Sequence, residues 1–115
     1  MTKRFFSNVV NGRERKWYTE SLWELAKELM PFDFAVEEFD FNQDVWFHDV
    51  HTPTVELVLD HMKRVQEADL QFPIILNKDG VIMDGVHRLC KARLNGLKTV
   101  KAVQFLNDPE PDEIL

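Results

Sequence analysis

The sequence predicts an α+β fold in which helices pack against a small mixed β-sheet. Two segments with apolar residues at helical spacing, 55–65 and 86–94, alternate with short apolar runs that are typical of strands. Turn signals rich in Gly, Pro, Asn and Asp separate these segments. The length of 115 residues, with 44% hydrophobic and 30% charged residues, suits one globular domain.

The N-terminal third contains signals for a hairpin, a helix and a strand. Asn11-Gly12 is a two-residue turn signal and predicts a hairpin around it. Ser21 and Glu24 have the spacing of a capping box, so we expect a helix over Ser21–Met30. Partial alternation of apolar residues then predicts a strand over Ala35–Phe39.

The rest of the chain predicts two helices between strands. Thr52-Pro53 can start a helix that runs to Ala68, because Thr can cap and Pro suits the first turn. A second helix is expected over Val86–Asn95 and should stop at Gly96. The expected strands are Phe72–Leu76, Val81–Met83 and Thr99–Leu106. We assign 1–106 to one domain and 107–115, with two Pro and four acidic residues, to a flexible acidic tail.

Charge and cysteine content narrow the function classes. The formal net charge of −6 argues against direct binding of nucleic acid, which usually requires a basic face. The single cysteine, Cys90, cannot form an intramolecular disulfide, which is compatible with a reducing cytoplasm, and we expect a cytoplasmic protein. No apolar run is long enough to span a bilayer, so we expect no membrane association.

The most informative segment is Asp84-Gly85-Val86-His87-Arg88, where a strand turns abruptly into a helix. Gly85 permits a sharp turn and leaves room for a ligand. The first turn of the helix presents unpaired N–H groups and the positive end of the helix dipole, which favours an anion. His87 and Arg88 add side-chain donors suited to phosphate oxygens. An ordinary helix start, in which Arg88 pairs with Asp84, also accounts for these residues.

Together with Ile82, Met83, Leu89, Ala92 and Gly96, this block resembles the signature of the ParB/sulfiredoxin superfamily, in which a Gly-x-His-Arg or Gly-Glu-Arg-Arg turn follows a strand. The helix Thr52–Ala68 and the run Gln71–Ile74 resemble the preceding helix and "Gln-Pro-Ile" strand, so the resemblance spans 36–106. It implies that the turn Gly85, Val86, His87 and Arg88 binds nucleotide phosphates, of ATP or CTP. It also implies that Asp84 orients a metal such as Mg²⁺ or an acceptor hydroxyl, with Asp84 and His87 as the catalytic residues, and that His61, Lys63 and Arg64 approach the nucleotide.

Departures from the family pattern limit the chemistry. Val86 stands where sulfiredoxins have their reactive cysteine, so sulfiredoxin chemistry is not expected. Val86 also replaces a His of the free-serine kinase branch, and the Glu of Gly-Glu-Arg-Arg is missing. We expect no helix-turn-helix region after the domain, and therefore no chromosome partitioning by this chain alone.

Two functions remain. The first is a nucleotide-binding domain, acting as a phosphotransferase toward a small-molecule acceptor or as a nucleotide hydrolase. The second is a non-catalytic interaction module, auxiliary to a DNA-handling system. No metal site is predicted from His48, Asp49, His51 and His61, because no cysteine or further histidine completes a ligand set.

Overall fold

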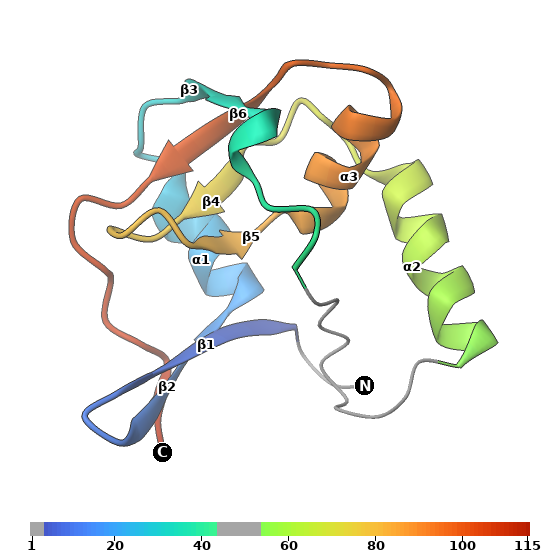
Figure 1. Cartoon of the computed structure of the whole chain (residues 1–115). Helices are drawn as coiled ribbons and strands as arrows, with labels where there is room; N and C mark the ends of the chain where they lie inside the picture. Colours follow the sequence, from blue (N-terminus) through green and yellow to red (C-terminus); the bar gives the residue numbers. More distant parts are fainter. Residues whose placement is uncertain (1–3, 44–53) are drawn as a thin grey trace.

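The centre of the fold is a four-stranded mixed sheet with the strand order β3-β6-β4-β5. In this computed structural model, which describes residues 4–43 and 54–115, β3 (Phe32–Ala35) runs antiparallel to β6 (Thr99–Gln104). The strand β4 (Ile74–Leu76) is parallel to β6, and β5 (Ile82–Asp84) is antiparallel to β4 (Figure 1). Helices pack against this sheet, so the expected α+β class is confirmed.

Apolar side chains cover both faces of the sheet, which explains why β4 is apolar throughout. On one face, α1 (Thr19–Ala26) and the N-terminal hairpin close a core formed by Trp17, Leu22, Ala26, Ile75, Met83, Val103 and Phe105. On the other face, α3 (Val86–Leu94) and the short 3₁₀ helix η1 (Val36–Glu38) close a core formed by Val36, Ile74, Leu76, Leu89, Ala92, Val100 and Ala102. The sheet is therefore the middle layer of the molecule.

The predicted hairpin is present as β1 (Phe5–Val10) and β2 (Arg13–Tyr18). Asn11 and Gly12 both have positive φ, 54° and 77°. Positive φ at both central residues is the requirement of the tight turns that join twisted antiparallel strands. The hairpin therefore follows from local turn chemistry.

Residues 107–115 are packed in the structure, although the composition predicts a loose tail. The strand β7 (Glu113–Ile114) pairs with β2 and completes a three-stranded sheet, β1-β2-β7. The indole Nε1 of Trp17 donates to the carbonyl of Pro109 over 2.9 Å, and Asp112 accepts hydrogen bonds from the Tyr18 amide and the Ser21 hydroxyl. These long-range partners hold a segment that has little apolar surface of its own.

Two N-terminal elements begin earlier than the sequence predicts. The helix α1 starts at Thr19, and its N-cap residue Tyr18 makes no side-chain cap. Ser21 lies inside the helix and donates to Asp112 at 3.0 Å, so the predicted capping box is wrong. The predicted strand over Ala35–Phe39 is displaced to β3, because β6 pairs with 32–35, and η1 follows at once.

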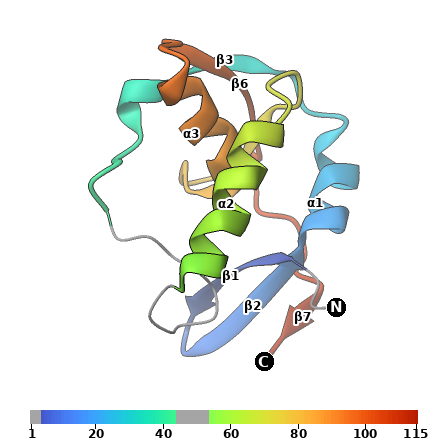
Figure 2. The same cartoon turned by 90° about the vertical axis from the view of Figure 1, so that its right-hand side faces the viewer.

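The helix α2 (Val55–Glu67) lies along the outer side of α3 (Figure 2). Thr54 caps it, since its Oγ1 accepts from the Leu57 amide at 3.1 Å. Thr52 and Pro53 lie outside the described residues, but the start predicted there is wrong, because Thr54 is extended and the helix begins at Val55. Lys91 of α3 donates to the carbonyls of Gln66 and Ala68, and so ties the C-terminal end of α2 to α3. Among the described helices, none has the length and apolar character needed to cross a membrane.

Candidate functional site

The turn from β5 into α3 is a tight strand-to-helix connection, as the sequence predicts. Gly85 is the N-cap residue of α3 and has φ of 118°, a backbone conformation that side-chain-bearing residues rarely adopt. A Cβ at this position would lie 2.5 Å from Cγ2 of Ile74 and 2.8 Å from Nη1 of Arg88. Glycine is therefore required both by the backbone angle and by the packing.

Asp84 and Arg88 form a nearly buried ion pair across this turn. Arg88 Nη2 lies 3.2 Å from Asp84 Oδ2, and only 14% and 13% of the two side chains are exposed. The same Oδ2 accepts from Trp23 Nε1 at 2.8 Å, and Arg88 Nη1 donates to the carbonyl of Pro73 at 3.1 Å. Arg88 thus pairs with Asp84, as in an ordinary helix start. Its guanidinium also joins α3 to Pro73, the residue just before β4.

A cleft of about 630 Å³ opens beside this turn. Its lining comes from β1, the segment after η1, α2, β5 and the first turn of α3. The polar and charged lining residues include Arg4, Asp40, His61, Arg64, Asp84 and His87, and the aromatic ones are Phe5, Phe6, Phe39 and Phe41. Of the predicted site residues, Asp84, Gly85, Val86 and His87 lie in this lining, whereas Arg88 is not among the described residues that form it.

Two histidines from different helices meet in the cleft. His61 Nδ1 on α2 and His87 Nε2 on α3 are 2.8 Å apart and share a hydrogen bond. The rings are inclined by only 14° and their centroids are 5.1 Å apart. The centroid separation is about the N···N distance plus the radii of the two rings, so the two nitrogens lie on the line between the ring centres. The rings therefore meet edge to edge, and the hydrogen bond lies nearly in both ring planes. An N–H···N bond needs one protonated and one bare nitrogen, so the contact depends on protonation.

The surroundings of His87 disfavour its charged form. Burial, then His61, Arg64 and Arg4, lower the pKa of His87 from 6.5 to about 4, against the opposing effect of Asp84. At neutral pH the ring is therefore uncharged and can still donate one hydrogen bond. A negatively charged ligand beside it would raise this pKa.

Two arginines supply positive charge to the cleft. Arg64 on α2 lines it and also pairs with Asp60 at 3.2 Å. Arg4, just before β1, lines it with its guanidinium 5.8 Å from the ring centroid of Trp23. The resemblance implies that His61, Lys63 and Arg64 approach the ligand. His61 and Arg64 line the cleft, but Lys63 is not among the described lining residues. Sequence reasoning missed Arg4, because no local pattern signals that β1 returns to the turn of α3.

Val86 and Cys90 line the cleft, although helical spacing places them on the core face together with Leu89. Leu89 and Ala92 form the buried stripe of α3 instead, and Val86 and Cys90 are only partly buried. Burial raises the pKa of the Cys90 thiol, which keeps it protonated at neutral pH. The thiol is therefore a poor nucleophile.

Within residues 4–43 and 54–115, no three His, Cys, Asp or Glu side chains are grouped as metal ligands. His48, Asp49 and His51, considered as ligands from the sequence, lie outside the described residues. Magnesium carried by a nucleotide needs only one or two protein carboxylates, and the cleft offers Asp40 and Asp84. The cleft thus offers two carboxylates, but no grouped set of protein ligands is found among the residues that the structure describes.

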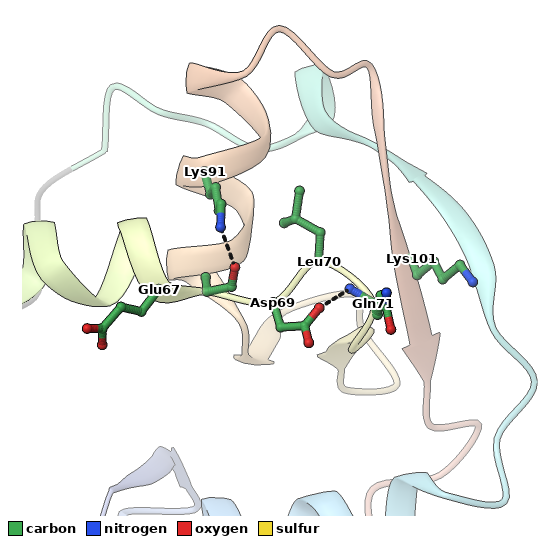
Figure 3. Close-up of a pocket in the computed structure, with 7 residues that line it drawn as sticks. Glu67, Asp69, Leu70, Gln71, Lys91 and Lys101 are labelled. Carbon is green, nitrogen blue, oxygen red and sulfur yellow. Dashed lines mark hydrogen bonds between the residues drawn. The ribbon is translucent and has the colours of Figure 1, made fainter.

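A second hollow lies between the end of α2 and the sheet (Figure 3). Two of its polar side chains are engaged within the protein: Lys91 Nζ is held by two backbone carbonyls, and Asp69 accepts from the Gln71 amide at 2.9 Å. This hollow is open to solvent, and seven residues line it. It serves the junction of α2 with α3.

The geometry thus brings the turn Asp84–His87 together with Arg4, His61 and Arg64 in one cleft. Arg88 lies behind the turn and braces it. Comparisons of this chain with protein-family models, with curated proteins and with solved structures found no match.

Proposed function

We propose that the cleft binds the phosphate groups of a nucleoside triphosphate, ATP or CTP, at the N-terminus of α3. One observation carries this proposal: the first turn of α3, Arg4, Arg64 and the His61–His87 pair all face the same cleft in a chain with a net charge of −6. Gly85 has no side chain to cap α3, so the N–H groups of its first turn are available to an anion. The resemblance of Asp84–Arg88 to the ParB/sulfiredoxin signature supports the same ligand class.

The nucleoside part has a suitable wall in the same cleft. Phe39 and Phe41 contact each other edge to face, with centroids 4.8 Å apart, and Phe5 and Phe6 line the β1 side. Arg93 lies over the Phe41 ring and Lys16 over the Phe5 ring, with centroid distances of 4.3 Å and 4.4 Å, so the other ring faces are the ones we assign to a base. Aromatic stacking adds affinity without selecting one nucleotide. A cleft of about 630 Å³ lies in the range typical of small-ligand sites, about 300–1,000 Å³.

For phosphoryl transfer or hydrolysis, Asp84 is the candidate to orient an acceptor hydroxyl or water. Both hydrogen bonds described for its carboxylate end at Oδ2, so Oδ1 is the oxygen we assign to this contact. The bound Mg²⁺ would neutralise phosphate charge. His87, neutral in the free protein, would donate a hydrogen bond to a phosphate oxygen and take up a proton as negative charge approaches.

A second candidate is the non-catalytic interaction module, auxiliary to a DNA-handling system. The observation that favours it is the position of Arg88, which is committed to Asp84 and to the Pro73 carbonyl. In that case the family-like turn has a structural role only. The presence of the cleft beside His87 leads us to prefer the nucleotide.

Calorimetric titration of ATP and CTP with Mg²⁺ tests the proposal. We expect the wild type to bind at least one of them, Arg64→Ala to weaken binding by about tenfold, and Lys27→Ala, which removes a charge outside the cleft, to bind normally. Repeating the titration near pH 6 in buffers of different ionisation enthalpy should show proton uptake, which His87→Gln abolishes. No binding of either nucleotide at about millimolar concentration would favour the interaction module.

A further inference from the structure

The outer face of α2 is apolar and unpartnered among the described residues. None of the residues of α2 is buried. Val55, Val58, Leu59 and Met62 are 79%, 41%, 54% and 53% exposed, and their spacing of three, four and seven residues places them in one stripe. Figure 2 shows α2 on the near side of the molecule, with the stripe-bearing helix outside α3.

This stripe is not the face that α2 uses within its own chain. The partly buried positions are Leu57, His61 and Val65, which follow one another at four-residue spacing and face the cleft and α3. The helix therefore has two apolar faces, of which only the inner one has a described partner. Contiguous apolar exposure of this kind marks an interaction surface.

We infer that the outer stripe of α2 binds the same stripe of a second copy of the chain, with the two helices antiparallel. Charge complementarity points to this occupant. Glu56 and Lys63 are seven residues apart, so they lie on the same flank of the stripe. Lys63 is also 4.0 Å from Glu67 of its own helix, an exposed and therefore weak contact that leaves the ammonium group accessible. In an antiparallel pair, Glu56 lies beside Lys63 of the partner subunit, and two-fold symmetry repeats the pair.

The size of the surface sets the strength of this association. A helix of 13 residues is about 20 Å long, so the paired stripes bury less area than the ~1,600 Å² of a standard stable interface. The dimer is therefore reversible and concentration-dependent. It does not depend on the proposed ligand, because the stripe faces away from the cleft.

Sedimentation equilibrium of the full chain tests the inference. We expect the average mass to rise toward that of a dimer between about 10 µM and 1 mM. Leu59→Glu should remain monomeric over this range, whereas Leu94→Glu, an equally drastic change at an exposed leucine of α3, should behave as the wild type. Circular dichroism confirms that each variant is folded.

A charge exchange tests the orientation. Glu56→Lys and Lys63→Glu should each weaken association several-fold, and the double exchange should restore it, since it re-forms both intersubunit pairs in reverse. In a Cys90→Ser background, Leu59→Cys should form a disulfide-linked dimer, because it lies near the two-fold axis. Val55→Cys should not, because in this register its two copies lie about 13 Å apart along the helices. A wild type that stays monomeric at about 1 mM, or a dimer that Leu59→Glu leaves intact, overturns the inference.

Discussion

His61 of α2 and His87 of α3 are joined by a 2.8 Å hydrogen bond between ring nitrogens, and this bond spans the cleft wall. It links α3, whose N-cap is Gly85, to α2, which has no buried residue. Because the two rings share a single proton in this bond, the contact weakens once both rings are fully protonated.

The pKa of His87 predicts how stability changes with pH. Its pKa is about 4 in the folded protein and 6.5 in the unfolded chain. As the pH falls from about 6.5 toward 4, the unfolded chain takes up a proton that the folded protein does not, so the free energy of unfolding decreases. Urea denaturation at pH 7.5 and 4.5 should show a smaller loss for His87→Gln than for the wild type. Equal losses would contradict the low pKa.

Gly85→Ala should destabilise the protein strongly. The added Cβ would meet Ile74 at 2.5 Å and would hold a positive φ, so we expect a loss of about 2–4 kcal/mol in thermal or urea denaturation. Gly80→Ala is the matched control, because its φ is 82° but nothing lies within 4 Å of the new Cβ. Its cost should be about 1–2 kcal/mol, from the backbone alone. Equal costs at both positions would mean that the contact with Ile74 relaxes freely.

Arg88 and Arg64 should separate stability from ligand binding. Arg88→Ala leaves Asp84 nearly buried with one partner fewer, and should cost about 3 kcal/mol of unfolding free energy. Arg64→Ala removes an exposed ion pair with Asp60 and should cost less than about 1 kcal/mol, while weakening nucleotide binding. Denaturation and calorimetry on both variants check this order. A stable Arg88→Ala variant that loses nucleotide binding would instead return Arg88 to the phosphate site.

Asp112 should stabilise the N-terminal sheet from the far end of the chain. It accepts from the Tyr18 amide at 2.7 Å and from the Ser21 hydroxyl at 3.0 Å. Asp112→Ala should therefore lower the free energy of unfolding by about 1 kcal/mol, since both donors lose their acceptor at a position where water can partly replace it. Glu110→Ala, an exposed acid of the same segment, should have an effect below about 0.5 kcal/mol. Comparable effects of the two substitutions would argue against the described hydrogen bonds.

Elements governed by local chemistry could be predicted from the sequence. Asn11-Gly12 predicts the hairpin because only certain residues tolerate two successive positive φ values, and Gly96, with φ of 70°, follows the end of α3 for the same reason. Elements that depend on partners far away in the sequence could not be predicted in this way. The start of α1, the position of β3 and the packing of 107–115 depend on pairing with Asp112, β6 and β2 respectively.

The candidate site shows the same division. The turn Asp84–His87 could be located because its residue order carries a local signal. The association of Arg4 with this turn is set by the return of β1 across the molecule, which no local pattern encodes. The pairing of Arg88 with Asp84 is one of the two alternatives that the sequence leaves open, and the structure contains this pair with both side chains nearly buried.

The hydrogen bonds from Lys91 to the Gln66 and Ala68 carbonyls make local stability uneven along α2. They fix α2 at its C-terminal end, while the rest of the helix contributes no buried side chain. The His61–His87 hydrogen bond, near the middle of α2, is a second described contact that holds this helix against α3. Amide hydrogens should therefore exchange with solvent fastest in the first half of α2, which lies farthest from the hydrogen bonds made by Lys91.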